Sequence, residues 1–407
     1  MSPRDISHEP AAIVGPRLPP LWLLTMLTGA GPFTMQVMLP ALPLLAQHFA
    51  VPYATAQLSF TVYLIGISVG QLIYGPLSDR FGRRPLLLCG LVVYLLGSIA
   101  ATLAPSLGLL VVARAAQAAG ACAGMVMTRA MIRDVFPANQ AASKIGFVMM
   151  GMTVAPMMAP LVGAELQALA GWRASMLACA AVGLVLPLLA LRYLSETLRE
   201  PQPLPGLLGI LRAYLRLFAS PVFCCYTAVT AFSSGVFFAF MAGAPRVLVE
   251  GLGHTPRAYA LAFMATSLSF ALGSFLAGRL SGRLGVQRML QAGLILTTAG
   301  ALLSLVTLLL LPLSLVMFFL PMLLMGVGNG ISQPNSLAAA ISVQPKLAGT
   351  ASGVVGASQM AVGALMTVAA GVLEAGTGFG TALVMTACAL ASQLGLASAR
   401  RLGPRGA

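Results

Sequence analysis

Residues 70–84 read GQLIYGPLSDRFGRR, and residues 273–287 read GSFLAGRLSGRLGVQ. The two stretches match at an offset of 203 residues, and each follows directly on a long apolar run. Two glycines of the apolar part and the pattern Leu-Ser-x-Arg-x-Gly recur in register. An internal repeat of this kind indicates a chain built from two related halves, with a basic turn at the same place in each.

The composition is that of a membrane protein. The chain has 407 residues, of which 58% are hydrophobic and only 8% charged, and its mean hydropathy is +0.93. A soluble domain could not hide so much apolar surface. Apolar runs of about 20 residues that satisfy their own backbone predict an all-α membrane protein. We expect twelve spans, over residues 21–44, 55–76, 86–104, 107–128, 143–165, 173–193, 222–244, 259–280, 289–311, 314–335, 350–373 and 378–399.

The net charge of +14 could reflect nucleic-acid binding or membrane topology. With twelve spans, the even-numbered loops and both tails fall on one side, which holds nineteen of the 23 Lys and Arg residues. The other side holds Arg173, Arg246 and Arg257, and Arg114 lies inside a span. Because basic loops stay in the cytoplasm, we expect both termini there. Charges spread over many short loops argue against a nucleic-acid interface.

The predicted spans form two pseudo-symmetric bundles of six helices around one long connection. We expect an N-terminal cytoplasmic tail (1–20), a first bundle (21–193), a cytoplasmic linker (194–221), a second bundle (222–399) and a C-terminal tail (400–407). Within the linker, residues 207–218 could form an interfacial amphipathic helix, with Arg212 and Arg216 one turn apart. Two related six-helix bundles are typical of secondary transporters.

The stretch at 70–84 resembles the hallmark of the major facilitator superfamily, which lies in the loop between spans 2 and 3. The resemblance implies the major facilitator fold and a cytoplasmic gate made of Gly75, Asp79, Arg80, Gly82, Arg83, Arg84 and Asp134. The glycines would let two helices approach closely. Asp79 would meet the positive N-terminus of span 11, near Gly349, and latch the outward-facing state. The second copy has Gly282 in place of Asp79, so only the first half carries the full latch. The alternative is that the arginines only anchor the topology.

Two further motifs resemble the same superfamily. Arg114 and Gln117 in span 4 resemble its Arg-x-x-Gln-Gly motif, which is linked to proton coupling. A guanidinium inside a bilayer is costly and marks a functional candidate, although backbone carbonyls could also satisfy a purely structural arginine. Pro156, Pro160 and Gly163 in span 5 resemble the antiporter motif of exporters. The alternative for these prolines is a generic helix kink.

Short sequence motifs narrow the resemblance to the Bcr/CflA subfamily of drug:proton antiporters. These motifs lie at residues 38–43, 129–134, 171–173, 195–197, 333–335 and 348–352. That subfamily carries an acid in span 1 where this chain has Gln36, and none of the nine acidic residues falls near the middle of a span. A cavity with Arg114 and no carboxylate should favour neutral or anionic solutes. For proton transfer, Glu165 is one candidate carrier, and an ionisable group on the substrate is another.

Side chains on helical stripes complete the candidate substrate cavity. They are Tyr63, Thr230, Ser234, Phe237, Met241, Asn329, Gln333 and Gln359. An apolar site with a few convergent polar groups suits small amphiphiles. Ordinary interhelical hydrogen bonding is the alternative role for these residues.

The resemblance implies a proton-coupled multidrug antiporter of the bacterial inner membrane that works by alternating access. Its expected partners are a small-molecule substrate, protons and the lipid bilayer, and we expect a monomer. The nearest alternative is a facilitator, or an importer or exporter, of one specific metabolite; a channel or lipid-handling protein is another. The sequence has no metal-ligand cluster, nucleophile–base pair or phosphate-binding loop, so we predict no metal, no cofactor and no enzyme activity.

Overall fold

The computed structural model describes residues 19–136, 148, 151–198, 207–344 and 347–402. These residues form helices and no strand. The first half comprises α1 (Leu21–Gln36), η1 (Leu39–Ala41), α2 (Leu42–His48), α3 (Tyr53–Ala56), α4 (Leu58–Phe81), α5 (Arg83–Thr102), α6 (Leu107–Val135), α8 (Gly151–Ala170) and α9 (Trp172–Tyr193). The second half comprises α11 (Pro221–Arg246), η2 (Val247–Gly251), α12 (Pro256–Leu284), α13 (Val286–Leu310), α14 (Leu315–Ser342), α15 (Ala348–Leu373) and α16 (Phe379–Leu402). Between them lies α10 (Leu207–Phe218), where the sequence predicts an amphipathic helix.

The helices bear out the predicted spans. Within the described residues, eleven helices are long and apolar enough to cross a bilayer, and Val154–Ala170 of α8 adds a shorter apolar one. Most of the predicted start of span 5, and the outer parts of both tails, lie outside the described residues. Span 1 is not one continuous helix as expected, because α1 ends before Pro40 and Pro43 and the chain resumes as α2 after a 3-10 turn.

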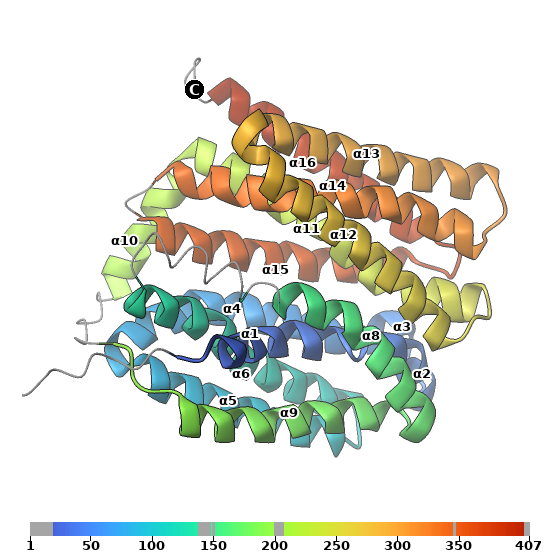
Figure 1. The fold of residues 1–407 in the computed structure, drawn as a ribbon. Coiled ribbons are helices and arrows are strands. Elements are labelled where there is room, and N and C mark those ends of the chain that lie inside the picture. Colours follow the sequence, from blue (N-terminus) through green and yellow to red (C-terminus); the bar gives the residue numbers. More distant parts are fainter. Residues whose placement is uncertain (1–18, 137–147, 149–150, 199–206, 345–346, 403–407) are drawn as a thin grey trace, which may run out of the picture.

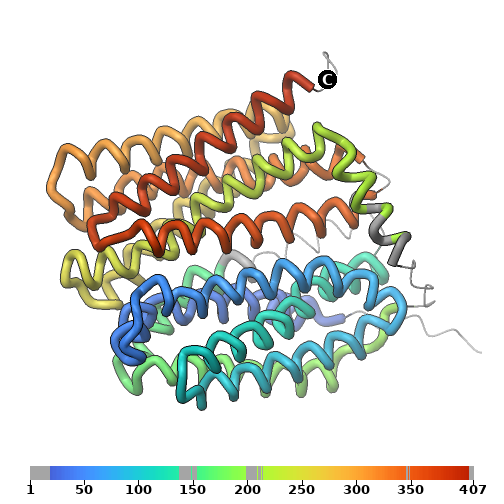
Figure 2. Tube along the Cα trace, turned by 180° about the vertical axis from the view of Figure 1, so that it is seen from behind, coloured from blue at the N-terminus to red at the C-terminus, as the bar shows by residue number. Residues whose placement is uncertain are grey.

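The helices divide into two bundles that lie one above the other in Figure 1. In the first bundle α5 packs on α6 and α9, and in the second α13 packs on α14 and α16. The bundles meet where α4 runs beside α15, in the middle of Figure 2, and where α8 lies against α12. Most exposed large side chains on the outer helices are apolar, as a lipid-facing surface requires.

The repeated basic turn consists of a single residue in each half. Gly82 joins α4 to α5 with φ +95°, and Gly285 joins α12 to α13 with φ +86°. Only glycine adopts this conformation without strain, so these two glycines end the preceding helices. Asp79 and Arg80 therefore lie in the last turn of α4, and not in a loop as the hydropathy pattern predicts.

The two repeated turns lie at the same end of the molecule (Figure 1). The end that contains Gly82 and Gly285 is called the arginine-rich end, since Arg80, Arg83, Arg84, Arg279, Arg283 and Arg288 cluster there along the chain. The end that contains Tyr53 and Arg246 is called the opposite end.

Candidate functional site

Arg83 is the centre of an ionic network at the arginine-rich end of the first half. Its guanidinium contacts the Asp79 carboxylate at 2.5 Å and the Asp134 carboxylate at 3.0 Å. It also donates to the hydroxyl of Ser78 at 2.5 Å, and its side chain is 8% exposed. Three of the residues predicted for the gate thus come together on α4, α5 and α6. The network holds these three helix ends at fixed distances.

Glu196, just beyond α9, caps the first turn of α5. Its carboxylate accepts hydrogen bonds from the backbone N–H groups of Arg83 (3.0 Å) and Arg84 (3.1 Å). These groups are unpaired within a helix, and a carboxylate also stabilises the positive end of the helix dipole. The Thr197 hydroxyl donates to Asp134 at 3.1 Å, so α9 joins the same network. The predicted gate does not include Glu196 or Thr197, because residues 195–197 indicate only the subfamily from the sequence.

The second half repeats the turn without the charges. Val286 stands where the first half has Arg83, and Gly282 stands where it has Asp79. The hydroxyl of Ser281, the counterpart of Ser78, is buried and has no hydrogen-bond partner. Within the described residues, the repeat therefore supplies the same backbone at both turns but an Arg83-type network at only one.

Two contacts expected at the gate are not made in this conformation. A Cβ at Gly75 would meet no heavy atom within 4 Å, so Gly75 makes no close helix approach. Gly70 does, since a Cβ there would lie 2.8 Å from the Cys122 sulfur of α6. The described partner of Asp79 is Arg83 rather than the start of α15, where the Arg133 guanidinium is 3.5 Å from the Cβ position of Gly349. Contact between Asp79 and α15 stays a prediction for another conformation.

Arg114 of α6 is fully buried inside the first half. Its guanidinium donates to the backbone carbonyls of Ser59 (3.3 Å) and Thr34 (3.2 Å) and to the side-chain oxygen of Gln117. The guanidinium carbon lies 4.2 Å from the ring centroid of Tyr63, a cation–π contact. No carboxylate of the described residues pairs with Arg114, and its Nη2 is buried without a hydrogen-bond partner. A buried, incompletely paired guanidinium can bind an anion or an acceptor.

The antiporter-like segment of α8 packs on α1 and η1. A Cβ at Gly163 would collide with the backbone carbonyl of Val37, so a glycine is required for this approach. Pro160 is buried, and Pro156 is half-buried one turn before it. The segment thus lies directly against the place where span 1 breaks.

Contacts between the halves close the opposite end. Glu165 of α8 pairs with Arg257 of α12 at 2.8 Å, and both side chains are well exposed. The Tyr53 hydroxyl donates to the Ala242 carbonyl of α11 at 2.6 Å. The Arg246 guanidinium lies 5.2 Å from the Tyr53 ring centroid. The sequence analysis considered Glu165 as a proton carrier, but it did not identify Tyr53 or Arg246.

Glu374, the buried acid of this end, has a structural role. Its carboxylate accepts the N–H of Gly378 (2.8 Å) and both the N–H (2.9 Å) and the hydroxyl (2.6 Å) of Thr381. These bonds cap the start of α16. The backbone carbonyl of Glu374 accepts a hydrogen bond from Arg246, which fixes the position of that guanidinium beside Tyr53.

Between the two ends, side chains of α4 and of Gln57, the residue before it, bond directly to α15. Gln57 donates to the Thr367 carbonyl at 2.5 Å, and the hydroxyls of Thr61 and Thr367 are 2.7 Å apart. Further along, Ser68 donates to the Ala357 carbonyl at 2.8 Å. The described residues of the two halves are therefore in contact along most of α4.

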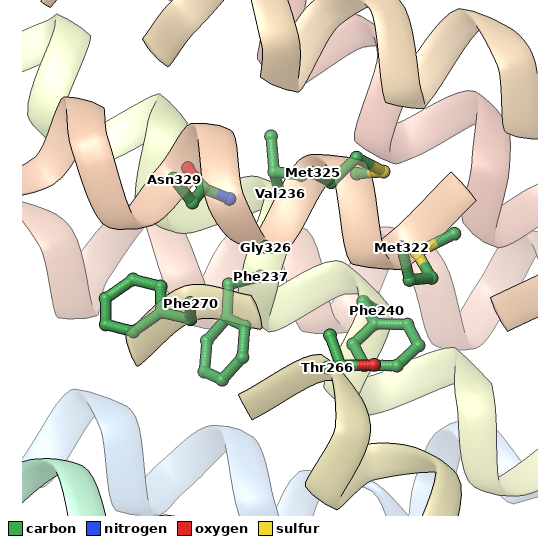
Figure 3. Close-up of a pocket in the computed structure, with 9 residues that line it drawn as sticks. All are labelled: Val236, Phe237, Phe240, Thr266, Phe270, Met322, Met325, Gly326 and Asn329. Atoms are coloured by element: carbon green, nitrogen blue, oxygen red, sulfur yellow. The ribbon is translucent and has the colours of Figure 1, made fainter. Parts of the chain in front are cut away.

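The second half contains a small aromatic pocket between α11, α12 and α14. It is lined by Val236, Phe237, Phe240, Thr266, Phe270, Met322, Met325, Gly326 and Asn329 (Figure 3). Its volume of about 20 Å³ holds about one water molecule. Phe237 and Phe270 are half-buried, and their ring centroids are 6.4 Å apart. Of the predicted cavity residues, Phe237 and Asn329 line this pocket.

The remaining cavity candidates are distributed around the core. Gln359 of α15 donates to the Ser234 hydroxyl of α11 at 2.8 Å, and the hydroxyls of Ser234 and Thr230 each donate to a carbonyl of their own helix. Asn329 accepts from Ser233, which the sequence analysis did not select, at 2.6 Å. Met241 and Gln36 are buried, and the side-chain oxygen of Gln36 has no hydrogen-bond partner. Gln333 is half-buried on α14 and does not line the pocket.

Comparison with known proteins identifies the family. The model of the Major Facilitator Superfamily matches residues 21–368. The chain is 32% identical to a chloramphenicol resistance protein of Pseudomonas aeruginosa, over 76% of this chain and 72% of that protein. It is 28% identical to a bicyclomycin resistance protein homologue of Haemophilus influenzae, over 95% and 97% of the two chains. A solved D-xylose–proton symporter shares the fold, with a TM-score of 0.74 and 15% identity over 91% of this chain and 95% of that chain. The chain therefore belongs to the major facilitator superfamily of membrane transporters, within the Bcr/CflA subfamily, and is not an enzyme.

Proposed function

We propose that this transporter exports small, neutral or anionic drug-like molecules in exchange for protons. The names of its relatives, which refer to chloramphenicol, bicyclomycin and multidrug resistance, support drug efflux. We infer the charge of the substrate from Arg114. Among the described residues its buried guanidinium has no carboxylate partner, and one of its nitrogens is unpaired. An anion or a hydrogen-bond acceptor would satisfy it, whereas a cation would be repelled.

The positions of the acids support the same conclusion. The described carboxylates of Asp79, Asp134 and Glu196 lie at the arginine-rich end, and those of Glu165, Glu250 and Glu374 lie at the opposite end. None is placed in the middle of a span, where it could hold a cationic drug. The aromatic pocket of the second half has room for only about one water molecule in this conformation, and its rings would offer a surface for the apolar part of a substrate once the halves separate.

We propose that the arginine-rich end and both termini face the cytoplasm of a bacterial inner membrane, as the excess of basic residues there indicates. Alternating access then consists of separating the halves at one end at a time. The network of Arg83 would keep the first half rigid at the cytoplasmic gate. The contacts of Tyr53, Arg246, Glu165 and Arg257 would form the outer gate.

The position of Glu165 bears on the proton route. An exposed ion pair with Arg257 between the halves suits a contact that breaks when the outer gate opens. The same exposed ion pair is less suitable for carrying protons through the middle of the membrane. We therefore favour a gate role for Glu165, and the other candidate proton carrier is an ionisable group on the substrate.

Uptake into inside-out membrane vesicles tests the function. Chloramphenicol, a neutral probe, should accumulate when the vesicle interior is acid, and a protonophore should abolish the accumulation. Accumulation that persisted undiminished in Glu165→Gln would exclude that carboxylate as the carrier. Entry that only followed the chloramphenicol gradient would support the alternative function, a facilitator of a small metabolite, and would sink the antiport proposal.

A further inference from the structure

The helix α10, between the two halves, has an exposed basic and apolar surface. Arg212 and Arg216 are the only charged residues of this helix, and both are exposed. Leu215 and Phe218 are 58% and 53% exposed. Exposed arginines beside exposed large apolar side chains are typical of helices that lie in the interface of a membrane.

The chain places α10 at the boundary of the membrane. Only two residues separate Phe218 from Pro221, where α11 begins to cross the bilayer. Ser220 caps that start by accepting the N–H of Phe223 at 3.4 Å. In Figures 1 and 2, α10 runs across the ends of the spans rather than along them. An amphipathic helix in this position lies level with the lipid headgroups.

Tyr214 of α10 reaches the other half. The Tyr214 hydroxyl donates to the backbone carbonyl of Leu72 in α4 at 3.2 Å. In an unbroken helix that carbonyl would accept the N–H of residue 76, but this residue is Pro76, which has none. Tyr214 therefore satisfies an acceptor that the proline leaves free. Partial burial raises the pKa of the Tyr214 phenol, so the hydroxyl keeps its proton and remains a donor.

The rest of α10 is attached to the second half. Leu217 is fully buried in a cluster with Phe223 of α11 and Val354 of α15. The Arg216 carbonyl accepts from the side chain of Gln344, at the end of α14, at 3.3 Å. Since α10 moves with the second half, the bond from Tyr214 to Leu72 exists only while the halves are together at this end.

We propose that α10 is an interfacial strap, which binds anionic lipid headgroups through Arg212 and Arg216 and holds the arginine-rich end closed through Tyr214. The partner is the anionic surface of the cytoplasmic leaflet. Lipid phosphates complement the two arginines, while Leu215 and Phe218 enter the apolar layer below the headgroups. Lipid binding keeps α10 in the plane of the headgroups, the position from which Tyr214 reaches Leu72, so anionic lipid favours the closed conformation over one in which α10 is displaced.

Distances between spin labels test the proposal in the intact transporter. The labels go on Phe81→Cys and Leu284→Cys, two exposed positions of the paired turns, after replacement of the six native cysteines. The protein is placed in nanodiscs of phosphatidylcholine alone or of phosphatidylcholine with phosphatidylglycerol. Each arginine near an anionic surface contributes roughly a fivefold preference, so with two arginines the ratio of closed to open distances should rise by up to roughly 25-fold with phosphatidylglycerol.

Matched variants separate the strap from general charge effects. Arg212→Gln with Arg216→Gln should remove the lipid response. Arg279→Gln with Arg288→Gln, which removes the same charge from exposed positions elsewhere at this end, should keep it. Tyr214→Phe should lower the closed fraction in both lipid mixtures, because it deletes only the hydroxyl. An unresponsive wild type, a full response without Arg212 and Arg216, or an unchanged closed fraction in Tyr214→Phe would each overturn the proposal.

Discussion

The side-chain oxygen of Gln57 in the first half occupies the space that a Cβ would need at Gly371 in the second half. The same arrangement recurs four turns along α4, where the oxygen of Gln71 occupies the Cβ position of Gly356. Gln57, just before α4, and Gln71 within it thus each fit against a glycine of α15. These two contacts lie on opposite sides of the hydroxyl pair of Thr61 and Thr367, so they report on the two ends of the transporter separately.

Gly371→Ala should weaken the closed opposite end. The added methyl group has to displace the Gln57 amide, and overpacking of this kind costs about 1–3 kcal/mol. Alkylation of a cysteine placed at Ala56, which is buried in the closed state, should therefore become faster in a chain whose six native cysteines have been replaced. Gly278→Ala is the control, because a Cβ there meets nothing within 4 Å. Equal alkylation rates in the two variants would contradict the prediction.

Arg83→Ala should destabilise the first half. The change removes hydrogen bonds to Asp134 and Ser78 and the ion pair with Asp79, and charge-assisted bonds contribute about 1.5–3 kcal/mol each before solvent exposure is considered. Asp79 is 45% exposed, so its share is small. Thermal unfolding in detergent should show a clear fall in Tm. Arg283→Ala removes an exposed arginine of the second turn, and a similar fall there would show that charge alone matters.

The paired serines of the two turns should respond in opposite directions. Ser78→Ala removes a hydroxyl that donates to Gly75 (2.8 Å) and accepts from Arg83, and should lower stability by about 1 kcal/mol. Ser281→Ala removes a buried hydroxyl without a partner, and should raise stability by a similar amount, about 1 kcal/mol. The midpoints of thermal unfolding compare the two directly. A loss of stability in Ser281→Ala would mean that the hydroxyl has a partner after all.

Arg114→Lys should abolish most proton-driven accumulation of chloramphenicol. A lysine keeps the charge but cannot donate at once to Ser59, Thr34 and Gln117, and losing one charge-assisted bond corresponds to roughly a tenfold effect. Arg173→Lys is the matched control, since Arg173 bonds a carbonyl at the opposite end. Undiminished accumulation in Arg114→Lys would remove the main support for the proposed substrate charge.

Much of this architecture could be predicted from hydropathy and spacing. The twelve spans follow from apolar runs, and the repeat places Gly82 and Gly285 at equivalent turns. Helix ends were less predictable, because hydropathy falls where charged residues begin, whereas the helix continues to the residue that can adopt a positive φ. For this reason Asp79 and Arg80 are helical.

The contacts of the site depend on pairs that are far apart in the sequence. Glu196 caps α5 from beyond α9, and Tyr214 satisfies a carbonyl that Pro76 leaves free. Neither pairing has a local pattern, although an acid next to an arginine-rich turn and a proline inside a span each indicate an unsatisfied backbone group. Arg114 was identifiable because a charge inside a span is expensive in any fold. Its lack of a carboxylate partner could be anticipated from the positions of the nine acids.

The single-residue connections at Gly82 and Gly285 have a mechanical consequence. A connection of one residue leaves no slack between two helices. A movement at the end of α4 must therefore be passed on to the start of α5, and one at the end of α12 to the start of α13. Of the first pair, α4 lies against α15, while α5 carries Val92, Leu96 and Ile99 on an exposed apolar surface. A movement that separates α4 from α15 should therefore also displace the lipid beside α5 and change the cross-section of the protein in the membrane. The turnover rate of this transporter should then depend on bilayer stiffness and lateral tension as well as on its substrate.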